Sequence, residues 1–229
     1  MAKNNAVLVL AHLSGPIAGD APQLDALLEM VLSIHHPKGV EGYKVDRQYP
    51  CLPPNQIPIP LMKHQIGDWL VACCSSPIYD RLDSEGVEHV GKRIGVEHAG
   101  LLEEHERKVV ATTNSWTKSY RLPLRIRHVN RIAWIAQGDR SDLLHVLKRV
   151  SYLGKKRAHG YGQVREWTVE RFDHPAWWYA DHEAGRVLMR PLPLGNWLPS
   201  NLIGYRRDFG ACVPPYWHPD RYGEVVVPC

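Results

Sequence analysis

The residues of this chain best suited to chemistry lie in one glycine-rich run, LGKKRAHGYGQV, at positions 153–164. Gly154, Gly160 and Gly162 bracket three consecutive cations, and the run separates a helix-like segment from a strand-like one. Glycine adopts positive φ without a steric penalty, and the successive amides of such a turn form a concave anion site. The residue order is neither that of a Walker loop nor that of a dinucleotide fingerprint. We therefore expect this glycine loop to contact the backbone of a nucleic acid.

Positive charge is concentrated around the glycine loop. Residues 118–165 contain twelve Lys or Arg but only two acidic residues, Asp139 and Asp142. The whole chain has a net charge of only +4, so the basic field is local. Such a field is the expected footprint of an anionic polymer. A solvated basic face on an ordinary enzyme stays open as the alternative.

Composition limits the class of protein. The 229 residues are 44% hydrophobic and 23% charged, which is typical of a soluble globular protein with a full core. The apolar run at 6–13 is too short to span a membrane, and no signal-peptide cleavage pattern accompanies it. We therefore expect a cytoplasmic protein without a membrane partner.

The cysteines give no sign of a disulfide framework or a zinc site. Five of them occur, at Cys51, Cys73, Cys74, Cys212 and Cys229. Their number is odd, their spacing is irregular and no C-x-x-C pair is present. We expect reduced, mostly structural thiols.

Periodicity predicts the elements that must position the glycine loop. Apolar and β-branched runs predict strands at 6–13, 69–74, 131–138 and 163–170. Helical spacing predicts helices at 23–32 and 142–150, and Asp139 or Ser141 would cap the second. This order indicates an α+β fold with a ferredoxin-like or RRM-like β-α-β-β-α-β core.

Other segments interrupt or follow this core. Gly and Pro at 37–60 indicate an irregular excursion, and residues 81–127 indicate a long hairpin-like or partly disordered insertion. Pro-rich residues from 175 onward hold four of the eight Trp, which indicates a loop-rich appendage whose tryptophans either fill a core or stack on bases. We divide the chain into a core at 1–172, with the insertion at about 81–127, and a C-terminal appendage at 173–229.

Three motifs together resemble the RAMP superfamily of CRISPR-associated proteins. They are AHLSGPIAG at 11–19, LDALL at 24–28 and GKKRAHGYG at 154–162. Within that superfamily the chain looks most similar to the Cas-five-type subunit of type IV systems, called Csf-three. The glycine loop is shared across the superfamily, whereas the N-terminal motif points to this subgroup. The resemblance covers about residues 6–170, and the C-terminal appendage contributes little to it.

The resemblance implies a subunit of an antiviral ribonucleoprotein complex. It would grip the five-prime handle of a CRISPR guide RNA and cap a filament of Cas-seven-type backbone subunits, near a large-subunit-like protein and the target DNA. The insertion would be a β-hairpin thumb that folds over the guide. The loop residues implied to contact RNA are Gly154, Lys155, Lys156, Arg157, His159, Gly160, Tyr161 and Gly162. We add Arg121, Arg125, Arg127 and Arg131 as expected backbone contacts, because their spacing places some of them on one strand face.

A metal-independent endoribonuclease is the alternative function, since some superfamily relatives cleave repeat RNA without a metal. Side chains able to move a 2′-hydroxyl proton are His12, His36, Tyr43 and His159, with His35 and Lys44 nearby. Each also has a structural interpretation, such as a satisfied strand histidine at His12. The acidic and histidine cluster at 98–106 is typical of solvated charge. We therefore expect no catalytic residue, no metal and no cofactor.

Overall fold

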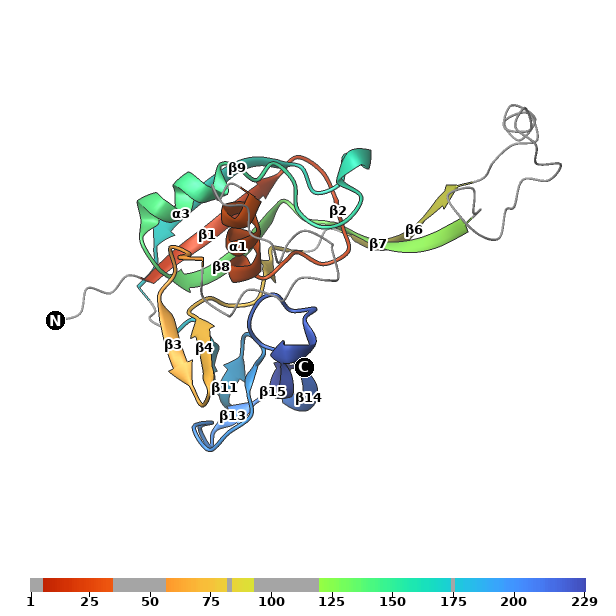
Figure 1. The fold of residues 1–229 in the computed structure, drawn as a ribbon. Coiled ribbons are helices and arrows are strands. Elements are labelled where there is room, and N and C mark those ends of the chain that lie inside the picture. Colours follow the sequence, from red (N-terminus) through yellow and green to blue (C-terminus); the bar gives the residue numbers. More distant parts are fainter. Residues whose placement is uncertain (1–5, 35–56, 82–83, 93–119, 174–175) are drawn as a thin grey trace, which may run out of the picture.

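Strands dominate the computed structural model of this chain, and two α-helices lie among its described residues (Figure 1). The structure describes residues 6–34, 57–81, 84–92, 120–173 and 176–229. The fold is therefore mixed α and β, as the sequence predicts. No helix in these ranges is long and apolar enough to cross a membrane.

A four-stranded antiparallel sheet forms the first core, with the order β5-β8-β1-β9. β1 (Ala6–Leu13) lies between β8 (Arg131–Gln137) and β9 (Val164–Arg171), and β5 (Ile78–Tyr79) forms the edge beside β8. Three of the four predicted strands are confirmed at these positions. The sequence of each of these strands is either an apolar run or an alternation of apolar and polar residues, because each strand buries at least one face.

Both helices pack on one face of this sheet. Alternate residues of β1, such as Val9 and Ala11, join residues of α1 (Leu24–Ile34) and α3 (Arg140–Leu147) in one buried cluster. Asp139 caps α3, since its carboxylate accepts a hydrogen bond from the Asp142 amide at 2.9 Å. The two predicted helices are confirmed with ends shifted by one to three residues. This leaves the opposite face of the sheet for other contacts.

The segment predicted as a core strand at 69–74 takes a different place. Its first part, β4 (Trp69–Ala72), pairs with β3 (Lys63–Ile66) in a separate two-stranded sheet. Beyond β4 the chain reaches β8 of the central sheet, where Cys74 forms an isolated bridge to Ala136. Two hydrogen bonds flank this bridge, because the Gln137 amide donates to the Cys73 carbonyl at 2.9 Å and the Ser75 amide donates to the Ile135 carbonyl at 2.8 Å. The two-residue strand β5 therefore takes the edge position.

A long hairpin stands at the place of the predicted insertion. β6 (Ser84–Lys92) and β7 (Tyr120–His128) pair antiparallel along nine residues each, and β2 (Ile17–Ala18) adds a short third strand to β7. The hairpin projects away from the body of the molecule (Figure 1). Residues 93–119 lie outside the described part, so the boundaries of the insertion stay a prediction.

The C-terminal region is more regular than the predicted loop-rich appendage. It holds two three-stranded sheets, with orders β10-β11-β13 and β12-β15-β14. Their strands are β10 (Tyr179–His182), β11 (Gly185–Leu188), β12 (Leu192–Pro193), β13 (Leu202–Ile203), β14 (Tyr205–Ala211) and β15 (Tyr222–Pro228). Most are two to four residues long and rich in Pro or charge, which weakens any periodic signal. Six strands therefore run through a segment that the sequence predicts to be rich in loops.

This region has its own core. Trp177, Leu192 and Val226 pack with Ile66 and Val71 of the β3–β4 hairpin, and Trp178 and Trp197 pack against the cluster. Three of the four C-terminal tryptophans are therefore structural. This cluster also includes residues from before position 172. The division of the chain into a core at 1–172 and an appendage at 173–229 therefore stays a prediction.

Arg190 joins the two cores. It is fully buried, and its guanidinium donates to the carbonyls of Ala72 (2.7 Å), Cys74 (2.9 Å) and Cys212 (2.9 Å). It also contacts Asp25 of α1 at 3.3 Å. A buried ion pair of this kind is tolerated only when its remaining donors and acceptors are satisfied.

Tyr216 completes this network. Its hydroxyl donates to the Asp25 carboxylate at 2.9 Å and accepts from Arg190 at 3.0 Å. Burial, and next the negative charge of Asp25, raise the pKa of the Tyr216 hydroxyl well above its ordinary value, so it keeps its proton. Although burial alone would lower it, the pKa of Arg190 is raised by Tyr216, Cys74 and Asp25. The guanidinium therefore stays charged.

Removing the Arg190 cation should destabilise the whole molecule. In Arg190→Met the Asp25 carboxylate is left buried and unpaired, which costs about 3–5 kcal/mol of unfolding free energy. The matched control is Arg206→Met, which removes an exposed pair with Asp208 and should cost at most about 1 kcal/mol. Urea unfolding followed by tryptophan fluorescence measures both. Equal losses in the two variants would contradict a structural role for the buried pair.

The buried thiols should resist alkylation in the native protein. Burial raises the pKa of Cys73 and Cys212 to about 11 and that of Cys74 to about 12. At pH 8 only about one in a thousand of the Cys73 thiols is then the reactive thiolate. We expect iodoacetamide to label the exposed Cys229 rapidly and these three only after unfolding, as read by peptide mass spectrometry. Native labelling of Cys73 at the rate of Cys229 would contradict this burial.

Candidate nucleic-acid interface

The glycine loop is fastened to the N-terminal segment at residues 14–19. The Lys155 amide donates to the Ala18 carbonyl and the Gly162 amide donates to the Pro16 carbonyl, each at 2.8 Å. The Ser14 amide returns a bond of 2.9 Å to the Gln163 carbonyl. Two of the three motifs that carried the family resemblance therefore lie side by side. Their hydrogen bonds fix the path of the loop backbone.

Positive φ angles shape the loop. Gly154, Gly160 and Gly162 have φ of 74°, 86° and 67°, and Lys156 also lies in the left-handed region at 54°. A Cβ on Gly162 would come within 1.9 Å of the Leu153 carbonyl oxygen. Side chains other than hydrogen are thus excluded there by both conformation and space. The expectation that the glycines permit a tight, unusual backbone path is confirmed.

The cations of the loop face outward. Lys155 and Arg157 are exposed, and Arg157 and His159 belong to a short 3-10 turn (Arg157–His159). Lys156 places its ammonium 5.8 Å from the ring centre of Tyr120. Among the described residues, no carboxylate pairs with Lys155, Lys156 or Arg157. The positive charge of this loop is therefore available to a ligand.

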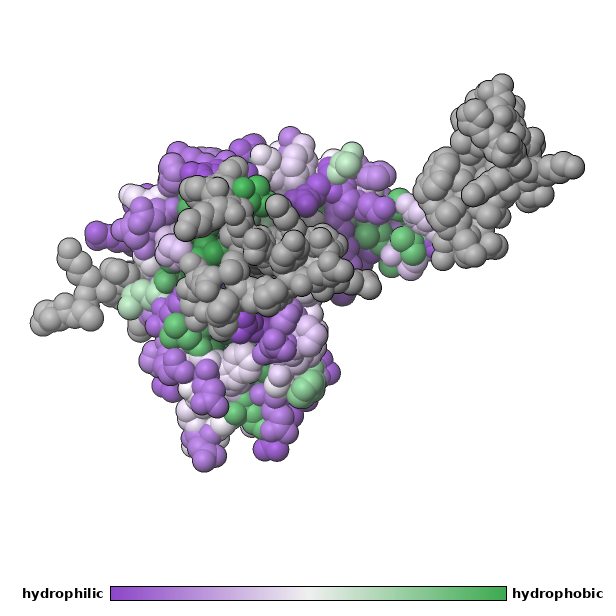
Figure 2. All heavy atoms as spheres, in the orientation of Figure 1, coloured by the Kyte–Doolittle hydropathy of each residue, from purple (hydrophilic) through white to green (hydrophobic). Residues whose placement is uncertain are grey.

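The base of the hairpin packs against the loop. Tyr161 donates a hydrogen bond to Glu88 of β6, and its ring packs beside Leu124 and Ile126 of β7 together with Ala18. The bond to Glu88 raises the pKa of the Tyr161 hydroxyl. Figure 2 shows hydrophobic surface on the projecting hairpin itself, where Val87, among others, is exposed. The loop and the hairpin thus form one continuous surface.

The four arginines expected to contact RNA differ in their freedom. Arg127 pairs with Asp20 and Glu85, lies 4.7 Å from the Tyr79 ring centre, and has a side chain only 12% exposed. It is structural. Arg125 pairs with Glu85, and Arg131 pairs with Asp80 at 2.9 Å. Arg121 is exposed and has no ion-pair partner among the described residues.

The sheet itself offers no stacking platform. The face of the central sheet opposite the helices carries residues such as Leu10, His12 and Thr168, and none of its described residues is aromatic. RRM domains read RNA with aromatics on this kind of face. This face of the central sheet therefore lacks the aromatic platform of an RRM domain among its described residues.

The catalytic candidates are not gathered into a site within the described residues. His12 is partly buried on β1, and its Nε2 lies 3.2 Å from the Thr168 hydroxyl. His159 is exposed on the loop. His36 and Tyr43, with His35 and Lys44, fall outside the described residues, as does the cluster at 98–106. No group of metal ligands occurs among the described residues.

A pocket of about 420 Å³ adjoins the loop, and sequence patterns did not predict it. It lies between α1, the first half of the loop and the segment at 215–217. Its walls include Ala26 and Met30 of α1, the Lys155 and Arg157 cations, and Trp217. Trp217 is 61% exposed, unlike the other C-terminal tryptophans. No local sequence pattern distinguishes an exposed Trp from a buried one, so the sequence alone could not assign Trp217 to the surface.

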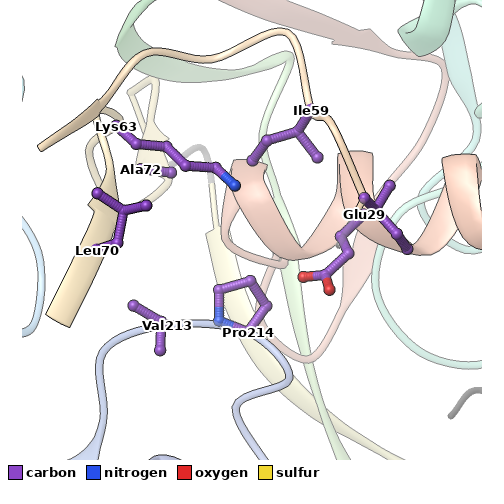
Figure 3. Close-up of a pocket in the computed structure, with 8 residues that line it drawn as sticks. Glu29, Ile59, Lys63, Leu70, Ala72, Val213 and Pro214 are labelled. Carbon is purple, nitrogen blue, oxygen red and sulfur yellow. The ribbon is translucent and has the colours of Figure 1, made fainter. Parts of the chain in front are cut away.

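A second concavity is too small to hold a ligand. The Lys63 ammonium and the Glu29 carboxylate point toward one space of about 20 Å³, walled by Leu70, Val213 and Pro214 (Figure 3). Burial, and next Asp25, raise the pKa of Glu29, while burial lowers that of Lys63. A space of this size admits about one water molecule. It is therefore packing around α1 and carries no binding function.

The family described as CRISPR type IV associated protein Csf3 matches residues 72–228. The chain belongs to this family. The Csf3 match includes the glycine loop, β7 and the whole C-terminal region, but not the N-terminal motif at 11–19. The expectation that the C-terminal appendage contributes little to the resemblance is therefore wrong. No curated protein matches the chain.

Two glycines of this Csf3 family member allow a matched test of the loop. Gly160→Ala and Gly162→Ala both impose positive φ on alanine, which costs about 1–2 kcal/mol. A Cβ at Gly160 meets open space, whereas one at Gly162 meets the Leu153 backbone and should cost a further ~1–3 kcal/mol. Urea unfolding compares the two variants. Equal stability would mean that the loop backbone is not held as described.

Proposed function

We propose that this chain is the RNA-binding subunit of a type IV CRISPR ribonucleoprotein complex, where it grips the five-prime handle of the guide RNA. The observation that carries the proposal is the glycine loop, whose backbone is pinned to residues 14–19 while Lys155, Lys156 and Arg157 stay unpaired among the described residues. A rigid main chain that presents free cations suits phosphate groups. Membership of the Csf3 family supplies the CRISPR setting.

We further propose that the central sheet is a ferredoxin-like core. Numbered by position within the sheet motif, β1, β5, β8 and β9 are its first to fourth strands, so the spatial order is 4-1-3-2. α1 follows the first strand and α3 follows the third, as in β-α-β-β-α-β units. This topology brings the chain after α3 back past the end of β1. The glycine loop and the motif at 11–19 meet for that reason.

The hairpin of β6 and β7 is proposed as the thumb. It packs against the glycine loop midway along β6, where Tyr161 bonds to Glu88, and it carries the exposed Arg121 farther along β7. An RNA strand that leaves the loop would pass along this face. Cas-seven-type subunits would then stack against the hairpin side of the molecule, with a large-subunit-like protein and the target DNA nearby.

Neutralising the loop should weaken RNA binding and flatten its salt dependence. We expect the Lys155→Gln, Lys156→Gln, Arg157→Gln variant to bind a single-stranded RNA carrying the repeat-derived five-prime handle about 10- to 100-fold more weakly at 0.1 M salt. Each lost phosphate contact on a single strand lowers the log–log salt slope by about 0.7, so three contacts lower it by about 2. Fluorescence anisotropy over a salt series measures both quantities.

The control removes equal charge from another surface. Arg140→Gln, Lys148→Gln, Arg149→Gln alters exposed residues on or just after α3 and should leave affinity and slope near wild type. Equal losses in both triple variants would reduce the interaction to net charge and overturn the loop assignment. A denaturing gel of the same mixtures reports cleavage. A discrete product that disappears in His12→Ala or His159→Ala would favour the endoribonuclease instead.

A further inference from the structure

The pocket beside the glycine loop combines an apolar interior with a cationic rim. Ala26, Leu27 and Met30 of α1 line one side, and Pro215 and Trp217 line another. Its volume of about 420 Å³ falls in the roughly 300–1,000 Å³ range of small-ligand sites. Lys155 and Arg157 stand at its border on the loop side. An apolar slot next to free cations suits a flat, uncharged ring that is attached to an anionic group.

Trp217 is held in place from both sides along the chain. Tyr216 is fixed by its hydrogen bonds to Asp25 and Arg190. His218 packs edge-on against the Trp217 ring at 5.7 Å between centres, and it caps the next 3-10 turn by accepting from the Asp220 amide at 3.3 Å. An exposed indole with a fixed backbone is a stacking surface that loses little entropy on binding.

The cations at the border are also positioned. The aliphatic stem of Lys155 lies over Gly19, where a Cβ would come within 3.1 Å of its Cδ. The acidic residue that lines the pocket, Asp20, is already engaged by Arg127. The net charge at the pocket mouth is therefore positive. This complementarity selects an anionic ligand over a neutral apolar peptide.

We infer that this pocket receives one nucleobase of the bound RNA, turned out of its strand and stacked on Trp217, while Lys155 and Arg157 hold the adjoining phosphates. The inference rests on the proposed RNA-binding function and adds to it a base-specific contact. Tyr152 lines the same pocket, and its hydroxyl has no hydrogen-bond partner among the described residues. It is placed to donate to or accept from a base edge.

The test compares two exposed aromatics in the full-length protein. Trp217→Ala should weaken binding of the handle RNA by about 5- to 100-fold, the usual effect of losing one stacked base, and Trp217→Phe should recover most of it. Phe209→Ala is the matched control, because Phe209 is 67% exposed on β14 and does not line the pocket, so it should bind as wild type. The salt slope should not change in either variant, because no cation is lost.

Abasic RNAs identify the base. A set of RNAs, each with one abasic nucleotide at a different handle position, is bound to both proteins. At one position the missing base should weaken wild-type binding as much as Trp217→Ala does. At that same position it should change the affinity of the Trp217→Ala variant less than about twofold. Ala26→Leu, which fills the pocket from α1, should reproduce the loss at the same nucleotide with Trp217 intact.

The outcomes separate this inference from the proposed function. If wild type binds the handle RNA and the loop variant loses it, but Trp217→Ala and Ala26→Leu bind normally, the loop holds a backbone and the base pocket is refuted. A single-base site would also be refuted if Trp217→Ala weakened binding by the same factor for every abasic RNA, whichever base is missing. If wild type does not bind the RNA at all, both the inference and the proposed function fail.

Discussion

The buried contact between Arg190 and Asp25 is the constraint on which the arrangement of the two cores depends. A guanidinium removed from water must find acceptors for its donors, and these come from three distant parts of the chain: α1, the end of β4, and the segment around Cys212. None of these segments can move alone without leaving a buried polar group unpaired. The C-terminal sheets are therefore locked to the first core and are not a loosely attached appendage.

A second constraint acts on the glycine loop, and it works through the backbone. The amides of Lys155 and Gly162 donate to the carbonyls of residues 18 and 16, so the path of the loop backbone does not depend on its three adjacent cationic side chains. Side chains that are not needed for structure can serve recognition. Among the described residues the three adjacent cations have no carboxylate partner, whereas Arg127 pairs with Asp20 and Glu85.

Local patterns predicted those elements whose stability is local. β1, α1, β8, α3 and β9 each bury a continuous face, and Asp139, one of the two predicted caps of α3, lies three residues from its partner Asp142. β5 was not predictable, since two residues carry no period, and neither was the C-terminal sheet pairing of strands two to four residues long. The Arg190–Asp25 contact joins positions 165 residues apart, so no sequence window contains it. The pocket at Trp217 was not predictable for the same reason, because its walls come from segments far apart in the sequence.

Charge counting along the sequence overstated the free positive charge of residues 118–165. Twelve cations between residues 118 and 165 predicted an RNA-facing surface, yet Arg125, Arg127 and Arg131 form ion pairs on the hairpin and the neighbouring strand. Their carboxylate partners lie 40 to 107 residues away in the chain, which a linear count treats as unrelated. Among the described residues, the loop cations and Arg121 have no carboxylate partner, but neither do basic residues on or just after α3, such as Arg140 and Lys148. Ion pairs between segments far apart in the sequence therefore lower the charge that a linear count assigns to the hairpin and the neighbouring strand, and they leave the loop cations as they are.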